Sequence, residues 1–237
     1  MTRKEAVRFL ILRTIGNFLV LFAVFGILAT FGPALYFEVS FRISEFRGVQ
    51  YVIAAGTRLQ NVMTFKTQSN TNTGIANFAD VLAGPKVQEL VPPDTDFSIV
   101  IPKIGASSKV FANVDASDQN QFLPVLLKGV AHAAGTVFPG MNGNIYLFAH
   151  STDNFWDVGR YNAVFYLLKD LQKGDQIVIF YQNVRHNYVV TDKKIVDPSD
   201  VSYLVNSQKQ SKEQLILQTC WPPGTTFQRL LVFASPK

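Results

Sequence analysis

The longest apolar stretch of the chain lies close to its amino terminus. No charged residue occurs between Thr14 and Phe37, and the run from Phe18 to Leu28 is almost wholly apolar. A helix over this stretch would be about 35 Å long, enough to cross a bilayer core of about 30 Å. A cleaved signal peptide has a shorter apolar core, of about 7–15 residues, followed by a small-residue cleavage site. The pattern therefore predicts an uncleaved transmembrane helix over residues 14–37.

From residue 91 onwards, short apolar or alternating runs are separated by turn residues, which is the pattern of a mainly β domain. The predicted strands are 97–101, 109–113, 144–149, 176–181, 186–191, 215–220 and 229–234. Short helices are expected over 119–128 and 163–171, and residues 129–136 read as a loop. Many short strands with few helices predict an antiparallel sandwich or a closed barrel.

Between the apolar stretch and the β domain lies a segment without clear periodicity. Its middle, residues 66–74, is polar and rich in Asn and Thr, which is typical of a flexible stalk or loop. The chain is thus expected to have four parts: a basic end over 1–13, the membrane helix over 14–37, a linker over 38–90 and a globular domain over 91–237.

The charge pattern predicts the orientation of the membrane helix. Four basic residues and one acidic residue precede it, namely Arg3, Lys4, Glu5, Arg8 and Arg13. The positive-inside rule then places the amino terminus in the cytoplasm and the residues after the helix outside the cell membrane. The net charge of +5 therefore partly reflects topology. No basic stripe with interleaved aromatic residues occurs, so a nucleic-acid partner is not expected.

Cys220 is the only cysteine of the chain, and it ends a predicted strand. An unpaired cysteine in an exported domain indicates a reactive thiol or an intermolecular bridge, although a buried structural cysteine gives the same count. Arg229 begins the next apolar run and His150 ends an earlier one. A thiolate nucleophile needs a neighbouring base, and a guanidinium can stabilise an oxyanion.

The histidine that would serve Cys220 is not settled by these patterns alone. His186 lies in a predicted hairpin beside Arg185 and is expected at the surface, whereas His132 and His150 both remain candidates. One cysteine and three scattered histidines show no metal-ligand spacing, so neither a metal nor another cofactor is expected.

Several motifs resemble those of the sortases, the membrane-anchored cysteine transpeptidases of bacterial surfaces. The segment Ile99–Gly105 is similar to their first strand, and residues 129–144 are similar to the stretch that leads to their catalytic histidine, which falls on His150. Leu217-Gln-Thr-Cys220 matches their cysteine motif from its second position, and Arg229-Leu-Leu-Val232 matches their arginine motif. The resemblance makes His132 a structural residue of the approach loop.

The resemblance implies a closed β-barrel of about eight strands with short helices, outside the membrane. It implies that Cys220 attacks the peptide bond after the threonine of a Leu-Pro-x-Thr-Gly-type sorting signal at the carboxyl end of exported proteins. His150 would protonate the leaving amine, Arg229 would stabilise the oxyanion, and Ala149 and Thr219 would contact the substrate. A cell-surface amine would then resolve the thioester.

Two departures from the family pattern concern residues beside the reacting groups. Ile216 replaces the first threonine of the cysteine motif, and Ala149 replaces a glycine before the histidine. Residues 38–90 lack an Asp-Pro-aromatic lid motif and no second apolar anchor follows the domain, so the pilus-polymerising subclass is not expected.

There are three alternatives to a sorting-signal transpeptidase. Water as the acceptor would make the protein a protease. Another exported Cys/His acyl transferase, such as an L,D-transpeptidase, is disfavoured because its Ser-x-Gly-Cys-x-Arg spacing is absent. A catalytically inactive binding domain on the same fold stays open.

Overall fold

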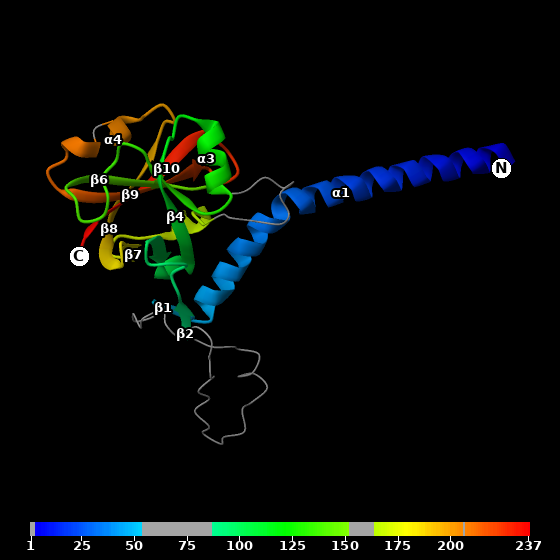
Figure 1. The fold of residues 1–237 in the computed structure, drawn as a ribbon. Coiled ribbons are helices and arrows are strands. Elements are labelled where there is room, and N and C mark those ends of the chain that lie inside the picture. The colour runs from blue at the N-terminus through cyan, green and yellow to red at the C-terminus, as the bar shows by residue number, and fades with distance from the viewer. Residues whose placement is uncertain (1–2, 54–86, 152–163, 206) are drawn as a thin grey trace, which may run out of the picture. The chain divides into compact units, whose positions relative to one another are not determined.

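A closed β-barrel dominates the computed structural model, which describes residues 3–53, 87–151, 164–205 and 207–237, with the side chains of 29–37 excepted. Figure 1 shows the barrel as a ribbon. Its strands follow the order β10-β8-β7-β3-β4-β5-β6-β9 around the barrel. Their bounds are β3 Phe97–Ile101, β4 Ala106–Val114, β5 Val130–Ala133, β6 Gly143–Phe148, β7 Gln176–Tyr181, β8 Val184–Val196, β9 Glu213–Trp221 and β10 Gln228–Pro236. The predicted barrel is thus confirmed.

Within the barrel, the strand pairs β4–β5 and β6–β9 are parallel, whereas the other neighbouring pairs are antiparallel. A parallel pair needs a crossover, because the chain must return to the starting end of the sheet. Helix α3 (Gln119–Leu126) provides the first crossover, and the β7–β8 hairpin lies within the second. The side chain of Asp118 accepts a hydrogen bond from the backbone of Asn120 and so caps α3.

Strands β7 and β8 form the hairpin that the sequence predicted, and the geometry of its turn explains why it forms. Gln182 and Asn183 form the two-residue turn with φ angles of 49° and 63°, and the flanking residues Tyr181 and Val184 pair directly. Positive φ at both central positions is the turn geometry that matches the twist of hairpin strands. Asparagine tolerates this region better than most residues, which explains its presence there.

Two segments differ from the sequence predictions. Residues 130–133, read as part of a loop, form strand β5, because β4 and β6 supply hydrogen-bond partners on both sides. Gly129 permits the approach of β4, since a Cβ there would lie 2.5 Å from the carbonyl oxygen of Lys109. Of the helix predicted over 163–171, the structure has a 3-10 helix, η2 (Tyr166–Asp170), and residue 163 lies outside the described residues.

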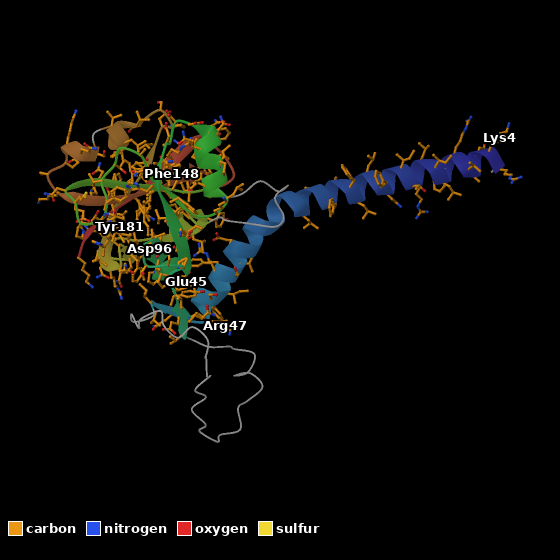
Figure 2. The ribbon with its side chains drawn as sticks, in the orientation of Figure 1. Lys4, Glu45, Arg47, Asp96, Phe148 and Tyr181 are labelled. Carbon is orange, nitrogen blue, oxygen red and sulfur yellow. The ribbon has the colours of Figure 1, made fainter. Side chains whose placement is uncertain are left out.

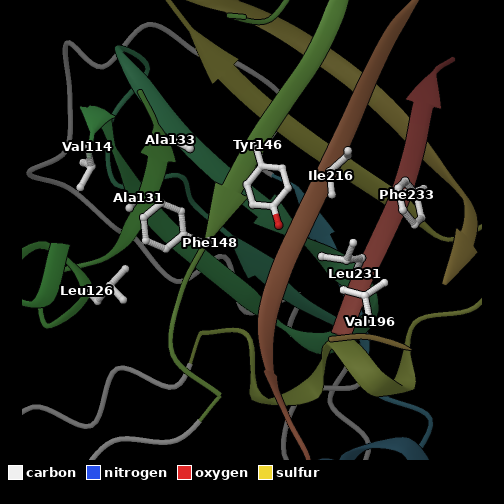
Figure 3. Packing of buried hydrophobic residues seen from close by; sticks show 10 residues of the cluster. All are labelled: Val114, Leu126, Ala131, Ala133, Tyr146, Phe148, Val196, Ile216, Leu231 and Phe233. Atoms are coloured by element: carbon white, nitrogen blue, oxygen red, sulfur yellow. The ribbon is translucent and has the colours of Figure 1, made fainter. Parts of the chain in front are cut away.

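Strand β6 and the middle of strand β9 bury both of their faces. Alternate residues of β6 and β9 such as Ile145, Leu147, Leu215 and Leu217 lie on one face, and they are fully buried. The opposite face carries a hydrophobic cluster that also includes Leu126 of α3 (Figure 3). The members of this cluster are Val114, Leu126, Ala131, Ala133, Tyr146, Phe148, Val196, Ile216, Leu231 and Phe233.

Helices α3 and α4 (Ser202–Val205) cover the second face. The ring of Phe122 in α3 meets Phe148 edge to face with 6.2 Å between ring centroids, and Tyr203 of α4 lies 5.4 Å from Phe233. Aromatic pairs at these separations add to the stability gained by burial alone. This face of β6, β9 and β10 is the one that leads to the candidate site.

The amino-terminal helix α1 forms a unit of its own and runs from Arg3 to Phe46. Its part from Arg3 to Leu28 contains an 18-residue window with a mean hydropathy of 2.1 and is long enough to span a membrane. Figure 2 shows side chains projecting on all sides of this part of the ribbon. Apolar residues all around a helix are typical of a membrane span. The helix extends further in both directions than the predicted span of 14–37.

Residues 38–46 of the predicted linker belong to helix α1, whereas its described residues 50–53 and 87–90 form strands of the barrel unit. Strands β1 (Gln50–Ile53) and β2 (Val87–Leu90) pair in parallel, and Ile53 and Leu90 pack against buried residues of β3 and β7. The ring of Tyr51 lies 3.0 Å from where a Cβ of Gly105 would stand. The central part of the linker, residues 54–86, lies outside the described residues, so the division at residues 90 and 91 stays a prediction.

Candidate active site

The candidate site lies where three neighbouring strands end or begin. Strand β9 lies between β6 and β10 in the barrel. Cys220 of β9 is paired with Arg229 of β10 in the antiparallel register. The two residues are therefore direct neighbours across the sheet, as the sequence predicted for an antiparallel pair.

His150 follows β6 on the other side of β9. The last pair of the parallel ladder joins Phe148 to Gln218, and continuing that register by two residues places His150 beside Cys220. The chain keeps this course beyond the ladder, because the backbone N–H of Ala149 donates to the carbonyl oxygen of Gln218 at 3.2 Å. Cys220 and Arg229 are thus paired on β9 and β10, and the continued register extends this row to His150, which follows β6.

Ala149 and Thr219 form a hydrogen bond next to this row. The hydroxyl of Thr219 donates to the carbonyl oxygen of Ala149 at 3.2 Å, and both residues are at least 95% buried. By strand alternation they lie on the face opposite to the three candidate residues. Their contact with substrate stays a prediction. The hydrogen bond between them connects β9 to the segment that contains His150.

The three residues of the row are partly exposed, whereas their neighbours Thr219 and Leu230 are buried. The side chain of Arg229 is directed by its own loop, since its Nη1 donates to the carbonyl oxygens of Thr226 and Gln228, both at 3.1 Å. The described residues offer no acceptor to its Nε or Nη2, so these donors can meet a ligand. A thiol, an imidazole and a fixed guanidinium in one accessible row can perform nucleophilic acyl transfer.

A second row lies behind the first on the same face. It consists of Phe148, Gln218 and Leu231, because the register pairs Gln218 with both neighbours. Gln218 is the polar member of this row, and the hydroxyl of Tyr146 donates to its Oε1 at 2.5 Å. Gln218 is not among the site residues predicted from the sequence. Strand alternation from Cys220 would have placed it on this face, but its pairing with Tyr146 depends on the parallel contact of β6 and β9.

His132, the other candidate histidine, lies in β5 and is completely buried. Its Nδ1 accepts a hydrogen bond from the backbone N–H of Asn113 at 3.4 Å, and its Nε2 donates to the carbonyl oxygen of Val137 at 3.0 Å. The ring also stacks on Phe138 with 4.5 Å between centroids. These contacts support a structural role. His186, expected at the surface, is partly buried in β8.

The contacts of His132 give the stability of the domain a pH dependence. Burial lowers the pKa of His132, against the raising effect of its hydrogen bond to Val137. In the unfolded chain the pKa is about 6.5, so acid protonates the unfolded state first. We therefore expect the free energy of unfolding to fall as the pH drops below about 6.5. Urea unfolding of the parent protein and of His132→Gln between pH 5 and pH 7.5 measures this.

His132→Gln should be less stable than the parent protein over the whole range from pH 5 to pH 7.5. Its free energy of unfolding should depend less on pH, because it lacks the imidazole that titrates. His186→Gln is the matched control, since this histidine lies in a partly exposed position. An equally steep pH dependence in His132→Gln would contradict the assignment.

No group of three or more His, Cys, Asp or Glu side chains within the described parts of the chain could hold a metal ion.

Comparison with known proteins identifies the family. The family model of the sortase domain matches residues 99–237, which include all three residues of the row. The chain belongs to the sortase family. Sortase D of Bacillus subtilis (strain 168) is 30% identical over 191 residues, covering 73% of this chain and 87% of that protein. The protein is accordingly a cysteine transpeptidase, and sortases are anchored in the membrane.

Solved sortase structures resemble the domain in fold. The crystal structure of sortase C-1 from Actinomyces oris is 26% identical, with a TM-score of 0.51, and the match covers 61% of this chain and 76% of that one. A pilus-related sortase C of Group B Streptococcus is 30% identical, with a TM-score of 0.50, over 60% of this chain and 66% of that one. The sortase family of the sequence analysis is thereby confirmed.

Proposed function

We propose that this sortase cleaves a Leu-Pro-x-Thr-Gly-type sorting signal after its threonine and transfers the threonine carbonyl to a cell-surface amine. The observation that carries the proposal is the pairing of Cys220 with Arg229, together with the β6–β9 ladder that ends two residues before His150 and Cys220. All three residues are partly exposed. A thiolate, a proton donor and an oxyanion partner are the three groups that acyl transfer through a thioester needs.

In the proposed reaction the thiolate of Cys220 attacks the threonine carbonyl carbon, and the carbonyl electron pair moves to the oxygen. The tetrahedral intermediate collapses when the bond to the leaving nitrogen breaks and His150 gives that nitrogen a proton. The resulting thioester is attacked by the acceptor amine, which loses a proton to His150 as the thiolate leaves. The products are a new amide and the free enzyme.

Arg229 is proposed to donate to the oxyanion. Its Nη1 bonds to two carbonyl oxygens of the preceding loop fix the guanidinium plane, and a fixed donor gains more from developing charge than a mobile one. Arg229→Lys keeps the charge but loses the fork of donors. We expect kcat to fall by about 10²–10³, the usual effect of removing one oxyanion donor.

Steady-state kinetics on a fluorogenic sorting peptide separate the two possible roles of Arg229. A loss in kcat supports action in the transition state, whereas a rise in KM alone would show ground-state binding only. Circular dichroism of the variant should match the parent, because Arg229 is partly exposed at the start of β10.

The orientation in the membrane is also proposed. Basic residues outnumber acidic ones before the apolar part of α1, which places the amino terminus in the cytoplasm and the barrel outside. Protease added to wall-stripped cells should digest the barrel and spare the amino-terminal end. Protection of the barrel would reverse the proposed orientation.

Product analysis tests the function itself. The full chain in detergent is incubated with a Leu-Pro-x-Thr-Gly-type peptide and hydroxylamine, a strong amine nucleophile that captures thioesters. Mass spectrometry should show a hydroxamate on the threonine and release of the glycine fragment. The absence of cleavage across peptides of this type would overturn the proposed substrate, and release of only the free acid despite the amine would indicate a protease.

A further inference from the structure

The face that carries the candidate row contains a polar group that the mechanism does not use. In the second row Phe148 is 6% exposed and Leu231 is completely buried, whereas Gln218 is partly exposed. A ligand that lies on this face next to Cys220 can therefore contact the side-chain amide of Gln218, whereas the two apolar neighbours of Gln218 are buried.

Tyr146 fixes which end of that amide is presented. Its ring belongs to the buried cluster of this face (Figure 3), and its hydroxyl donates to Oε1 of Gln218 at 2.5 Å. Burial raises the pKa of Tyr146, so the hydroxyl keeps the proton that it donates. With Oε1 engaged, Gln218 presents its Nε2 donors, for which the described residues provide no acceptor.

The spacing of the two rows matches that of an extended peptide. Gln218 and Cys220 are two residues apart on one strand face, a separation of about 6.5–7 Å. A substrate in extended conformation advances by the same distance over two residues. A peptide that runs along β9 with its cleaved bond at Cys220 therefore places a carbonyl group near Gln218, about two residues from the attacked carbonyl.

We propose that Gln218, oriented by Tyr146, donates a hydrogen bond to a main-chain carbonyl of the substrate about two residues before the cleaved bond. The amide then acts as a specificity-determining donor, which accepts an oxygen at this point of the peptide and disfavours an N–H group. This role rests on the proposed function, because it requires an extended peptide at Cys220.

Three variants test the donor. Gln218→Leu removes it, Gln218→Glu replaces it with an acceptor of the same shape, and Tyr146→Phe releases the amide so that either end can face the substrate. We expect KM for the sorting peptide to rise about 5–10-fold in Gln218→Leu, more in Gln218→Glu and less in Tyr146→Phe, with kcat changed little.

Gln214→Leu is the matched control. Gln214 lies on the same strand and the same face, is likewise partly exposed, and is six residues from Cys220. Its variant should keep the parental KM.

A modified peptide separates substrate contact from a structural effect. Replacing the amide that contains the carbonyl by an ester weakens that oxygen as an acceptor. The parent enzyme should lose kcat/KM several-fold on the ester peptide, whereas Gln218→Leu should treat both peptides nearly alike. The same loss in parent and variant, or equal KM values for the two Gln→Leu variants, would overturn the role of Gln218. Failure of the parent enzyme to cleave either peptide would instead overturn the proposed function.

Discussion

Replacing Cys220 with alanine is expected to abolish both cleavage of the sorting peptide and formation of a covalent acyl-enzyme. The chain has no second cysteine, and a serine or threonine hydroxyl is a much weaker nucleophile without a base of its own. The side chain is partly exposed at the end of β9, so its truncation should leave the barrel intact.

Intact-mass spectrometry after incubation with the peptide checks this expectation. The parent protein should gain the mass of the acyl fragment, and digestion should map it to Cys220. Cys220→Ala should show no such adduct, although its unfolding midpoint should stay close to the parental value. Cleavage at the parental rate by Cys220→Ala would exclude the mechanism proposed here.

Replacing His150 with alanine should lower kcat by about 10²–10⁴, the usual contribution of a general acid or base. The physical reason is that the amine leaves poorly from the tetrahedral intermediate unless it is protonated. The loss should be accompanied by a change in the pH–rate profile, since the variant lacks one of the titrating groups that shape it. A structural role alone would not change that profile.

His186→Ala serves as the control for His150→Ala. His186 lies in β8, a strand that pairs with β7 and β10 rather than with β9. We expect this variant to retain parental kinetics. Equal losses in the two variants, or parental activity in His150→Ala, would remove His150 from the mechanism.

Among these residues, the amino-acid sequence supplied the candidates for the reacting groups but not their arrangement. The three residues could be proposed because each borders an apolar run, and because their motifs resemble those of a known family. The antiparallel neighbourhood of Cys220 and Arg229 also followed from sequence, since a short loop between two strands favours their pairing.

Tertiary structure decided the place of His150. It is separated from Cys220 by the whole β7–β8 hairpin, and only the parallel pairing of β6 with β9 brings the two strand ends together. Such pairing depends on contacts distant in sequence, which local periodicity does not report. The pairing of β6 with β9 also brings Tyr146 to Gln218. The proposed role of Gln218 in substrate specificity therefore could not be predicted from the sequence either.

Residues 130–133 show that secondary structure can also depend on pairing between distant strands. The run Val-Ala-His-Ala between Gly129 and residues 134–136 carries a weak strand signal, yet it forms β5 because its edges are paired on both sides. The apolar helix needed no such partners, since its backbone hydrogen bonds are internal to the helix. The sequence therefore determined the anchor, the hairpin and the chemical groups, whereas the packing of distant strands decided where those groups meet.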